Sequence, residues 1–471
     1  MRTVLNLLQS KKCFISLVIL NFIVGITVFL INRKNLGGDF LSYTSLAEGI
    51  LNGKYSMYYF LEGNFPDTYR NPGYPIFLAF LKIFSPSIIF VQVIQLIIYF
   101  ITIIISLKTI DYYFNDNYSI KNLFLSFLLI SLNIVILTPF FLAEILMAFL
   151  IVFSFYFELK FTKNNYSKFI ILGLLYGIIF QVRPIFLFFP LLKFTLDLFI
   201  YRKNFKFIKN SISILIYFLT MIPFGLWNYQ NHGVFRITSL QGGAEVMNAG
   251  YWAQKIPNYY EDRSFGNIFF EELILFINLN DRKKNIENYN KEWDFIDSSC
   301  SKYLTKEDLF QKELKTQNKY LALPITYSSN YTIEKENVIK AITLNDILND
   351  KEYVIKSKIY SAIRLWVTGV QIDKFRKATL AGKLILMAPI FLTGFVFLLA
   401  IIFIPIAVIK YKILFAKFHS IILIIIYFGL IHIPFVIQAR YTIPVRMLLL
   451  MVLSVSIYYV LFKPIVNDDE S

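Results

Sequence analysis

The sequence predicts an all-α protein that crosses a membrane about ten times. Hydrophobic residues make up 56% of its 471 residues and charged residues only 17%, whereas soluble domains carry about 45–50% apolar and about 25% charged residues. Apolar runs near the roughly 20 residues that a spanning helix needs recur along the chain. This composition excludes a disordered chain, a coiled coil, a disulfide scaffold and an ordinary cytosolic enzyme.

The apolar runs give the expected membrane helices in chain order. The first, residues 13–31, is followed by a polar Asn-Arg-Lys stretch and no small-residue cleavage site, so we expect an uncleaved anchor helix. The stretch 169–200 is too long for one span, and Arg183-Pro184 within it predicts two helices joined by a tight turn. The other runs lie at about 88–107, 121–140, 144–159, 211–227, 384–409, 419–437 and 443–462.

The loops between these runs predict the orientation. With the N-terminus inside, the inside loops are basic and the short outside loops hold at most one basic residue each, as the positive-inside rule requires. We therefore expect a multi-pass plasma-membrane protein with both termini in the cytoplasm. The net charge of +16 is explained by this topology, and no nucleic-acid partner is expected. The inside loops are 108–121, 160–168, 202–209 and 410–417, and the outside loops are 138–144, 183–185 and 438–442.

Three regions follow from this arrangement. Residues 1–245 form a transmembrane module whose first outside loop, 33–87, is partly helical. Residues 246–379 form a polar extracytoplasmic domain that mixes Asp and Glu with Lys, Asn and Tyr and contains amphipathic helical stretches. Residues 380–471 form the C-terminal membrane helices and a cytoplasmic tail.

The first outside loop holds the first candidate site residue, Asp39. Gly37 and Gly38 separate the first span from the next helix, and Asp39 lies at the N-cap or in the first turn of that helix. Tyr43 lies on the same helix face as Asp39, and Glu48 falls on another. Spacing alone leaves a capping role open for Asp39.

Arg70 follows in the same loop, within the segment Tyr-Arg-Asn-Pro-Gly-Tyr-Pro at 69–75. Two prolines around a glycine predict a rigid turn before an apolar helix. Arg70 would then lie near the membrane surface, where a guanidinium can grip a phosphate in a bidentate manner. The alternative is an arginine that merely extends its charge to the interface.

Three later spans each place an ionisable group at the same outer face. These groups are Glu144, Arg183 and Arg440. Each alone is consistent with a residue at a helix boundary. Because charged groups are unfavourable at membrane depth unless they are paired, the three together predict a polar site beside the Asp39 loop.

The histidines predict no metal centre. No cluster of His, Cys, Asp or Glu surrounds His232, and His432 is expected to pack within a helix. The chain has neither a phosphate-binding glycine loop nor a zinc-protease motif. We therefore expect no cofactor, and no motif supports a divalent metal.

At this point the chain resembles a known family. The sequences GGDFLSYTSLAEGILNGKYS and RNPGYPIFLAF in the first loop, together with three later segments, are similar in order and sidedness to GT-C superfamily membrane glycosyltransferases. The resemblance is to the bacterial group of Rgt-type lipopolysaccharide-modifying, aminoarabinose and protein O-mannosyl transferases. It covers roughly residues 12–245 and 384–462. The later segments lie at 172–191, 223–243 and 439–450.

The resemblance implies a function and a set of site residues. A polyprenyl-phosphate sugar is bound at the outer membrane face, and the sugar passes to an extracytoplasmic glycan, lipid or protein. Asp39 matches the catalytic carboxylate and Glu144 a second acidic residue. Several relatives carry two adjacent acids in the first loop, whereas Gly38 precedes Asp39 here. This difference argues against a catalytic site in which two adjacent acids act together or share a metal ion. Candidates for donor-phosphate binding are Arg70, Arg183 and Arg440, and candidates for substrate contact are Tyr43, Tyr74 and His232.

The expected chemistry is a single inverting displacement. A polyprenyl phosphate leaves without protonation if cations stabilise its developing charge. The acceptor hydroxyl needs one base, which Asp39 supplies if its environment raises its pKa. Three alternatives remain: a transporter, which calls for ionisable groups near mid-membrane; a lipid-linked polysaccharide polymerase or ligase, with its key Arg and His in the late outside loop; and a scaffold without activity.

Overall fold

The structure, a computed structural model, describes residues 2–61, 65–161, 165–252, 255–256, 279–304, 328–367, 378–435 and 438–463. Within these residues the chain is helical and contains no strand, which confirms the all-α class. Six helical segments of the described chain are long and apolar enough to cross a membrane. They are Lys11–Asn32, Ile88–Phe114, Pro184–Tyr201, Phe207–His232, Leu380–Lys410 and Ala439–Phe462.

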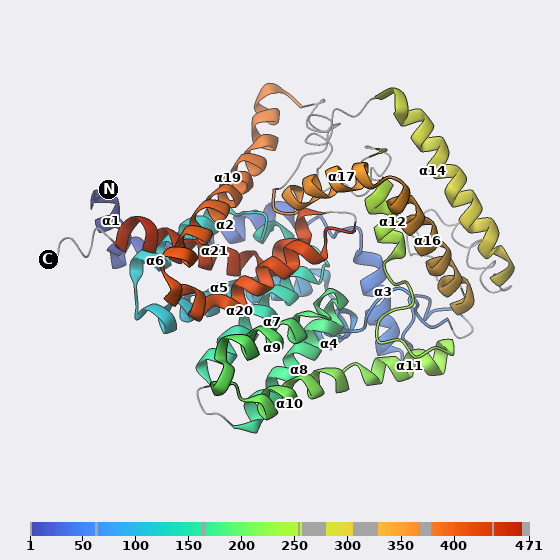
Figure 1. Cartoon of the computed structure of the whole chain (residues 1–471), viewed down its shortest axis with the longest axis horizontal. Coiled ribbons are helices and arrows are strands. Elements are labelled where there is room, and N and C mark those ends of the chain that lie inside the picture. The colour runs from blue at the N-terminus through green and yellow to red at the C-terminus, as the bar shows by residue number, and fades with distance from the viewer. Residues whose placement is uncertain are drawn as a thin grey trace.

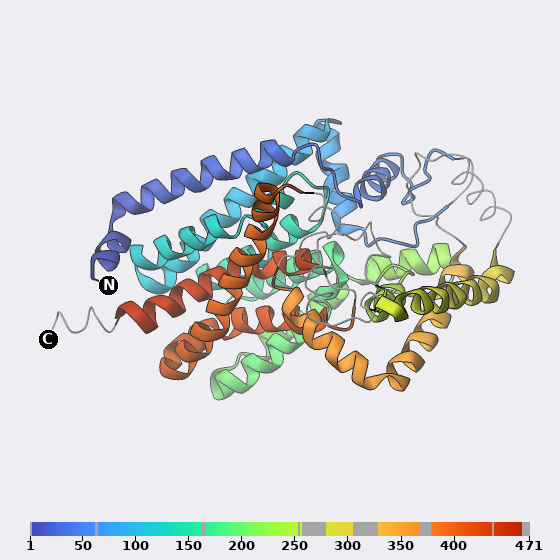
Figure 2. The same ribbon diagram turned by 90° about the horizontal axis from the view of Figure 1, so that it is seen from above.

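Most apolar helices form one elongated bundle, with the first and last described helical segments of the chain at the same end (Figure 1; Figure 2). The bundle helices are α1 (Arg2–Gln9), α2 (Lys11–Asn32), α5 (Ile88–Phe114), α6 (Tyr118–Ile130), α7 (Glu144–Lys160), α8 (Tyr166–Val182), α9 (Phe189–Tyr201), α10 (Phe207–Leu219), α11 (Ile222–His232), α19 (Leu380–Lys410), α20 (Lys412–Ile431) and α21 (Ile443–Ile457). Short helical turns extend several of them: η1 (Val135–Leu137), η2 (Pro184–Phe186), η3 (Arg202–Asn204), η6 (Ala439–Thr442) and η7 (Tyr458–Phe462).

Helix α21 forms the centre of the bundle. All of its residues are buried, and it packs against α5, α6, α7, α19 and α20. A helix that is apolar on every side is stable only when neighbours surround it. By contrast, α2 and α19 expose many large apolar side chains, as expected of helices that face lipid.

The remaining helices gather at the end of the bundle away from the termini (Figure 2). Helices α12, α14, α16 and α17 pack on one another there, and α3 packs on α4. Residues 253–254, 257–278, 305–327 and 368–377 of the predicted polar domain lie outside the described residues. The bounds are α3 (Phe40–Leu51), α4 (Gly73–Phe84), α12 (Ala244–Trp252), α14 (Leu279–Cys300), η5 (Ser301–Tyr303), α16 (Ser329–Asn349) and α17 (Lys351–Arg364).

Two of the predicted span boundaries need correction. The run 121–140 is not one helix, because α6 ends at Ile130 and the buried segment 131–143 is mostly irregular. Buried irregular backbone requires hydrogen-bond partners from within the protein. Gln92 donates to the Pro139 carbonyl, and Gln95 donates to the carbonyls of Thr138 and Phe140. The run 419–437 is also shorter than predicted, because α20 ends at Ile431.

The predicted break at Arg183-Pro184 is confirmed. Helix α8 ends at Val182, Arg183 adopts an extended conformation, and a new turn begins at Pro184. The start of α4 lies against this break. A Cβ added to Gly73 would lie 2.4 Å from the Gln181 carbonyl carbon, so only glycine permits this approach. This contact brings the 65–72 loop, with Arg70, beside Arg183.

Candidate functional site

Asp39 occupies the N-cap position of α3, but its side chain makes no capping hydrogen bond. Its two carboxylate oxygens accept instead from two arginines. Arg70 Nη2 lies 2.6 Å from Oδ1, and Arg440 Nη1 lies 3.2 Å from Oδ2. The capping alternative is therefore wrong, and Asp39 pairs with an arginine 401 positions away in the chain. Glu48 faces away as predicted, where it pairs with Lys82 and Tyr59.

The backbone of the Arg70 segment is fixed by buried polar groups. Asp67 Oδ2 accepts hydrogen bonds from the N–H groups of Tyr69 (3.0 Å) and Arg70 (2.7 Å). The Tyr55 hydroxyl donates to the Arg70 carbonyl at 2.9 Å. These bonds make a tight turn that aims the Arg70 side chain at Asp39.

Aromatic rings hold the Arg70 guanidinium on two sides. Its central carbon lies 4.7 Å from the Tyr43 ring centroid and 4.3 Å from that of Tyr69. Such cation–π contacts fix a guanidinium without using its hydrogen-bond donors. Tyr43 thus lies against the arginine that pairs with Asp39, which agrees with the helix face that the sequence predicted the two residues to share.

Glu144 begins α7 and is fully buried. Its Oε1 atom lies 3.3 Å from Arg183 Nη2 and 3.7 Å from Arg440 Nε. A buried carboxylate without a cation would be strongly unfavourable, so the two arginines balance its charge. Arg440 lies between the two acids and joins Glu144 to Asp39.

The predicted acids and arginines thus form one cluster. Its members are Asp39, Arg70, Glu144, Arg183 and Arg440. Three guanidiniums face two carboxylates, so the cluster carries one excess positive charge. An anion that entered it would find guanidinium partners whose charge is not fully neutralised.

A cavity of about 260 Å³ opens beside this cluster. Arg70 and Arg183, two of the three candidates for phosphate binding, both line it. Its remaining wall combines aromatic rings, aliphatic side chains and two glycines of the α11–α12 connection. The lining residues are Tyr43, Tyr69, Arg70, Asn71, Val182, Arg183, Pro184, Ile185, Ser239, Gly242, Gly243, Val246, His432, Phe435 and Tyr441.

Two predicted substrate contacts are absent from this wall. Tyr74 is fully buried; its ring packs on Tyr43, and its hydroxyl donates to Gln95 at 2.8 Å. Both ring nitrogens of His232 are engaged, one by Ser329 at 2.7 Å and one by the Asp67 carbonyl at 3.2 Å. Tyr74 and His232 therefore do not line the cavity. Tyr74 contacts Tyr43, and His232 contacts the backbone of Asp67, so both side chains pack against residues of the site.

His432 lines the cavity although the sequence analysis did not place it in the site. His432 was expected to pack in mid-helix, but α20 ends one residue before it and places its ring at the cavity. The ring stacks on Tyr441, with centroids 5.1 Å apart, and Nδ1 lies 2.8 Å from the Phe428 carbonyl. Pro434 two residues later was the available signal, because proline marks a helix boundary.

The ionisation of Asp39 differs from the expectation. Burial acts to raise its pKa, but the Arg70 and Arg440 guanidiniums outweigh burial and hold the pKa well below its usual range. The carboxylate is therefore ionised and a weak base while both arginines bind it. The predicted rise in pKa is not present in this arrangement.

Asp67 shows the opposite shift. Burial raises its pKa to about 6, although the Arg70 and Tyr69 N–H groups and the Arg70 charge oppose the rise. One of its oxygens, Oδ1, is buried and has no hydrogen-bond partner in the described chain. This residue was not singled out from the sequence, where nothing distinguishes it from other loop carboxylates.

The described residues contain no group of three or more His, Cys, Asp or Glu side chains arranged to hold a metal ion.

Comparison of the chain with protein-family models, with curated proteins and with solved structures finds no match. The site must therefore be interpreted from its own geometry.

The Asp67 environment predicts a pH dependence of stability. Because its folded-state pKa of about 6 exceeds the unfolded value of about 3.9, its stabilising contribution is full below pH 4 and is lost as pH rises through 6. Asp67→Asn keeps an oxygen for the Tyr69 and Arg70 N–H groups but cannot ionise. Thermal unfolding of the purified protein should show wild type losing stability relative to Asp67→Asn between about pH 4 and about pH 6.5, with no further change above that. A difference that stays constant over this range would contradict the assignment.

Proposed function

We propose that this protein is a membrane glycosyltransferase that moves a sugar from a polyprenyl-phosphate donor to an extracytoplasmic acceptor with inversion. The observation that carries the proposal is the cavity lined by Arg70 and Arg183, beside which the partly exposed carboxylate of Asp39 pairs with Arg70 and Arg440. This combination supplies cations for a phosphate and a base for a hydroxyl. The resemblance of the chain to GT-C glycosyltransferases points to the same reaction.

The arginines bind the donor phosphate in this mechanism. A phosphodiester carries one negative charge, which equals the excess positive charge of the cluster. When the phosphate accepts hydrogen bonds from Arg70 and Arg440, it competes with Asp39 for the same donors. The carboxylate then loses the interactions that lower its pKa, and it becomes a stronger base only when the donor is bound.

The transfer step follows from this exchange. Asp39 removes the proton of the acceptor hydroxyl as its oxygen attacks the anomeric carbon. The bond from that carbon to the phosphate oxygen breaks, and polyprenyl phosphate leaves with one more negative charge. The guanidiniums stabilise this added charge. Protonated Asp39 then gives its proton to water, which restores the carboxylate.

An apolar groove next to the cavity supports a lipid-linked donor. It has a volume of about 640 Å³, lies between α19, α20 and α21, and includes Trp366 and Ile433. Ile433 directly follows His432, which lines the arginine cavity. A polyprenyl chain is entirely apolar, and its burial in the groove would place its phosphate end at the guanidiniums.

The proposal includes the sidedness of the chain. Ten apolar helices with the N-terminus inside would put the basic loops in the cytoplasm and the Asp39 cavity at the outer face of the plasma membrane. The helices at 244–252, 279–300 and 329–364 would then lie outside, where they could contact the acceptor. The α11–α12 connection supports this role, because Ser239, Gly242 and Gly243 line the cavity.

A polymerase or ligase remains the alternative. That class was expected to place its key Arg and His in the late outside loop. Among the described residues, the segment 228–379 contributes neither an Arg nor a His to the cavity wall. The geometry therefore favours transfer from a donor held by the first loop.

The first test of the reaction is Asp39→Asn. Asn keeps the size of Asp39 but cannot take the hydroxyl proton, so transfer from lipid donor to acceptor should fall by roughly 10²–10⁴-fold. Glu48→Gln is the matched control, because Glu48 lies on the same helix and pairs elsewhere. Sugar transfer would be measured in membranes with equal amounts of each variant. Near wild-type transfer by Asp39→Asn would remove Asp39 from the mechanism.

The second test concerns the phosphate. Purified protein should bind farnesyl phosphate and not farnesol, and Arg183→Gln should raise the dissociation constant by roughly 10- to 100-fold through loss of a charged hydrogen bond. Arg33→Gln, an exposed arginine after α2, is the control and should bind as wild type does. Equal binding of farnesol and farnesyl phosphate would show that the arginines do not recognise phosphate.

The third test concerns sidedness. In a chain with Cys13→Ala and Cys300→Ala, the exposed position Asn288, replaced by Cys, should react with an impermeant thiol reagent on intact cells. Lys108→Cys, at the opposite end of the bundle, should react only after lysis. The reverse pattern would overturn the topology and the reaction that depends on it.

A further inference from the structure

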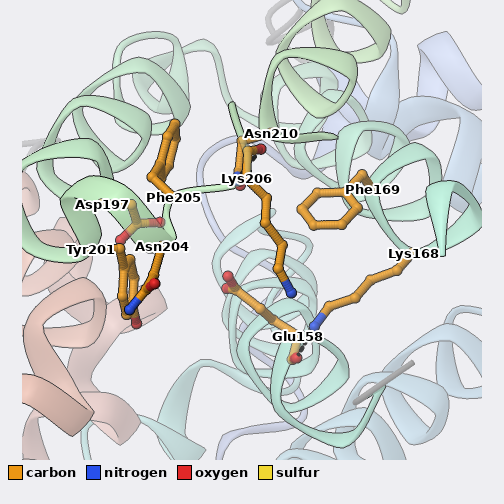
Figure 3. A pocket seen from close by; sticks show the side chains of 9 residues that line it. All are labelled: Glu158, Lys168, Phe169, Asp197, Tyr201, Asn204, Phe205, Lys206 and Asn210. Carbon is orange, nitrogen blue, oxygen red and sulfur yellow. Dashed lines mark hydrogen bonds between the residues drawn. The ribbon is translucent and has the colours of Figure 1, made fainter. Parts of the chain in front are cut away.

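A second polar cavity, of about 290 Å³, lies at the other end of the bundle (Figure 3). Helix α8 joins the two sites, since Lys168 in its first turn lines this cavity and Arg183 at its end lines the other. The 17 residues of α8 separate them by about 25 Å, at 1.5 Å per residue. The lining residues are Glu158, Lys168, Phe169, Asp197, Tyr201, Asn204, Phe205, Lys206 and Asn210.

Both carboxylates of this cavity pair with one buried lysine. Lys193 bridges Glu158 at 2.8 Å and Asp197 at 2.7 Å, and Asp197 also accepts from His419 at 2.8 Å. Glu158, Lys193, Asp197 and His419 thus form one connected network of charged and polar side chains at this cavity. With Lys168 and Lys206, three lysines therefore face two carboxylates, which leaves one positive charge in excess.

The two additional lysines point into the cavity. Figure 3 shows the Lys168 and Lys206 side chains both extending toward Glu158. Lys168 donates to the Glu158 carbonyl at 2.6 Å, which leaves further donors on its ammonium. In the described part of the chain, the Lys206 ammonium has no hydrogen bond or ion pair. An anion that entered this cavity could therefore accept a hydrogen bond from the Lys206 ammonium.

Two helix starts add to the positive potential. Helices α8 and α10 both begin at this cavity, and neither has a side-chain cap on its first N–H groups. Unsatisfied N–H groups and the helix dipole favour an anion at such a position. Lys168 and Asn210 come from the first turns of these helices.

The surroundings favour an amphiphile over a soluble anion. Phe169 and Phe205 form part of the cavity wall, and Phe199 and Ile208 nearby are each 70% exposed. Large apolar side chains with this exposure on membrane helices contact acyl chains. A ligand with a phosphate head and apolar tails satisfies both parts of the site.

We propose that this cavity binds the phosphate head group of an anionic phospholipid. The ammonium groups of Lys168 and Lys206 hold the phosphate, Asn204 and Asn210 contact the polar head, and the acyl chains lie along Phe199 and Ile208. The bound lipid ties α8 to α10 and so stabilises the helix that carries Arg183. This site is independent of the sugar-transfer reaction.

The test uses the full chain purified in detergent. Phosphatidylglycerol in mixed micelles should raise the thermal unfolding midpoint, and phosphatidylcholine should not. Lys168→Gln and Lys206→Gln should each raise the phosphatidylglycerol concentration for half of the shift by about fivefold, and Lys206→Arg should restore it. Lys108→Gln, an exposed lysine at the same end of the bundle, is the control and should not change it.

Several results would overturn this proposal. One is an equal shift with phosphatidylcholine, and another is an equal loss of binding in Lys108→Gln. A full shift with inorganic phosphate alone would identify a soluble phosphate as the ligand. The midpoint of each variant without lipid shows whether the substitution itself changes stability, so a folding defect is distinguished from lost binding.

Discussion

Pairing between buried carboxylates and guanidiniums is the constraint on which this end of the molecule depends. Glu144 is fully buried at the start of α7, and water cannot compensate its charge. Arg183 and Arg440 must therefore approach it, and Arg440 in turn brings Asp39 into the same cluster. Four separate chain segments are fixed in this way around one cavity. A buried charge that is left without any partner typically destabilises a protein by about 3–5 kcal/mol. Arg440 pairs with both acids, so each acid keeps one guanidinium when Arg70 or Arg183 is replaced.

The same pairing explains how the proposed base can be controlled. An aspartate held by two arginines is ionised and weakly basic, so it is inactive toward a hydroxyl until another anion takes its partners. A donor phosphate is such an anion. Binding and activation are then one event, because the phosphate that positions the sugar also releases the carboxylate. The rigid turn around Asp67 and the aromatic rings on Arg70 keep the guanidinium in place during this exchange.

The helical class, the break at Arg183 and the clustering of five charged residues could all be predicted from the sequence, because apolar runs and charges at their ends obey strong physical rules. The end of α6 at Ile130 could not, since it depends on glutamines of another helix that satisfy the irregular backbone. Tyr74 was misassigned for a similar reason: its residue type suits a binding site, but only the packing shows that its hydroxyl is used internally. The low pKa of Asp39 depends on Arg70 and Arg440, and the sequence pattern alone paired neither arginine with it.

The most direct test of the central claim is the structure of the protein with farnesyl phosphate, determined by electron cryomicroscopy. The account predicts phosphate oxygens about 2.7–2.9 Å from the guanidinium nitrogens of Arg70 and Arg440. The bond between Asp39 and Arg70 should be broken, and the prenyl chain should lie in the groove between α19, α20 and α21. A phosphate bound elsewhere, with Asp39 still paired to Arg70 and Arg440, would contradict it.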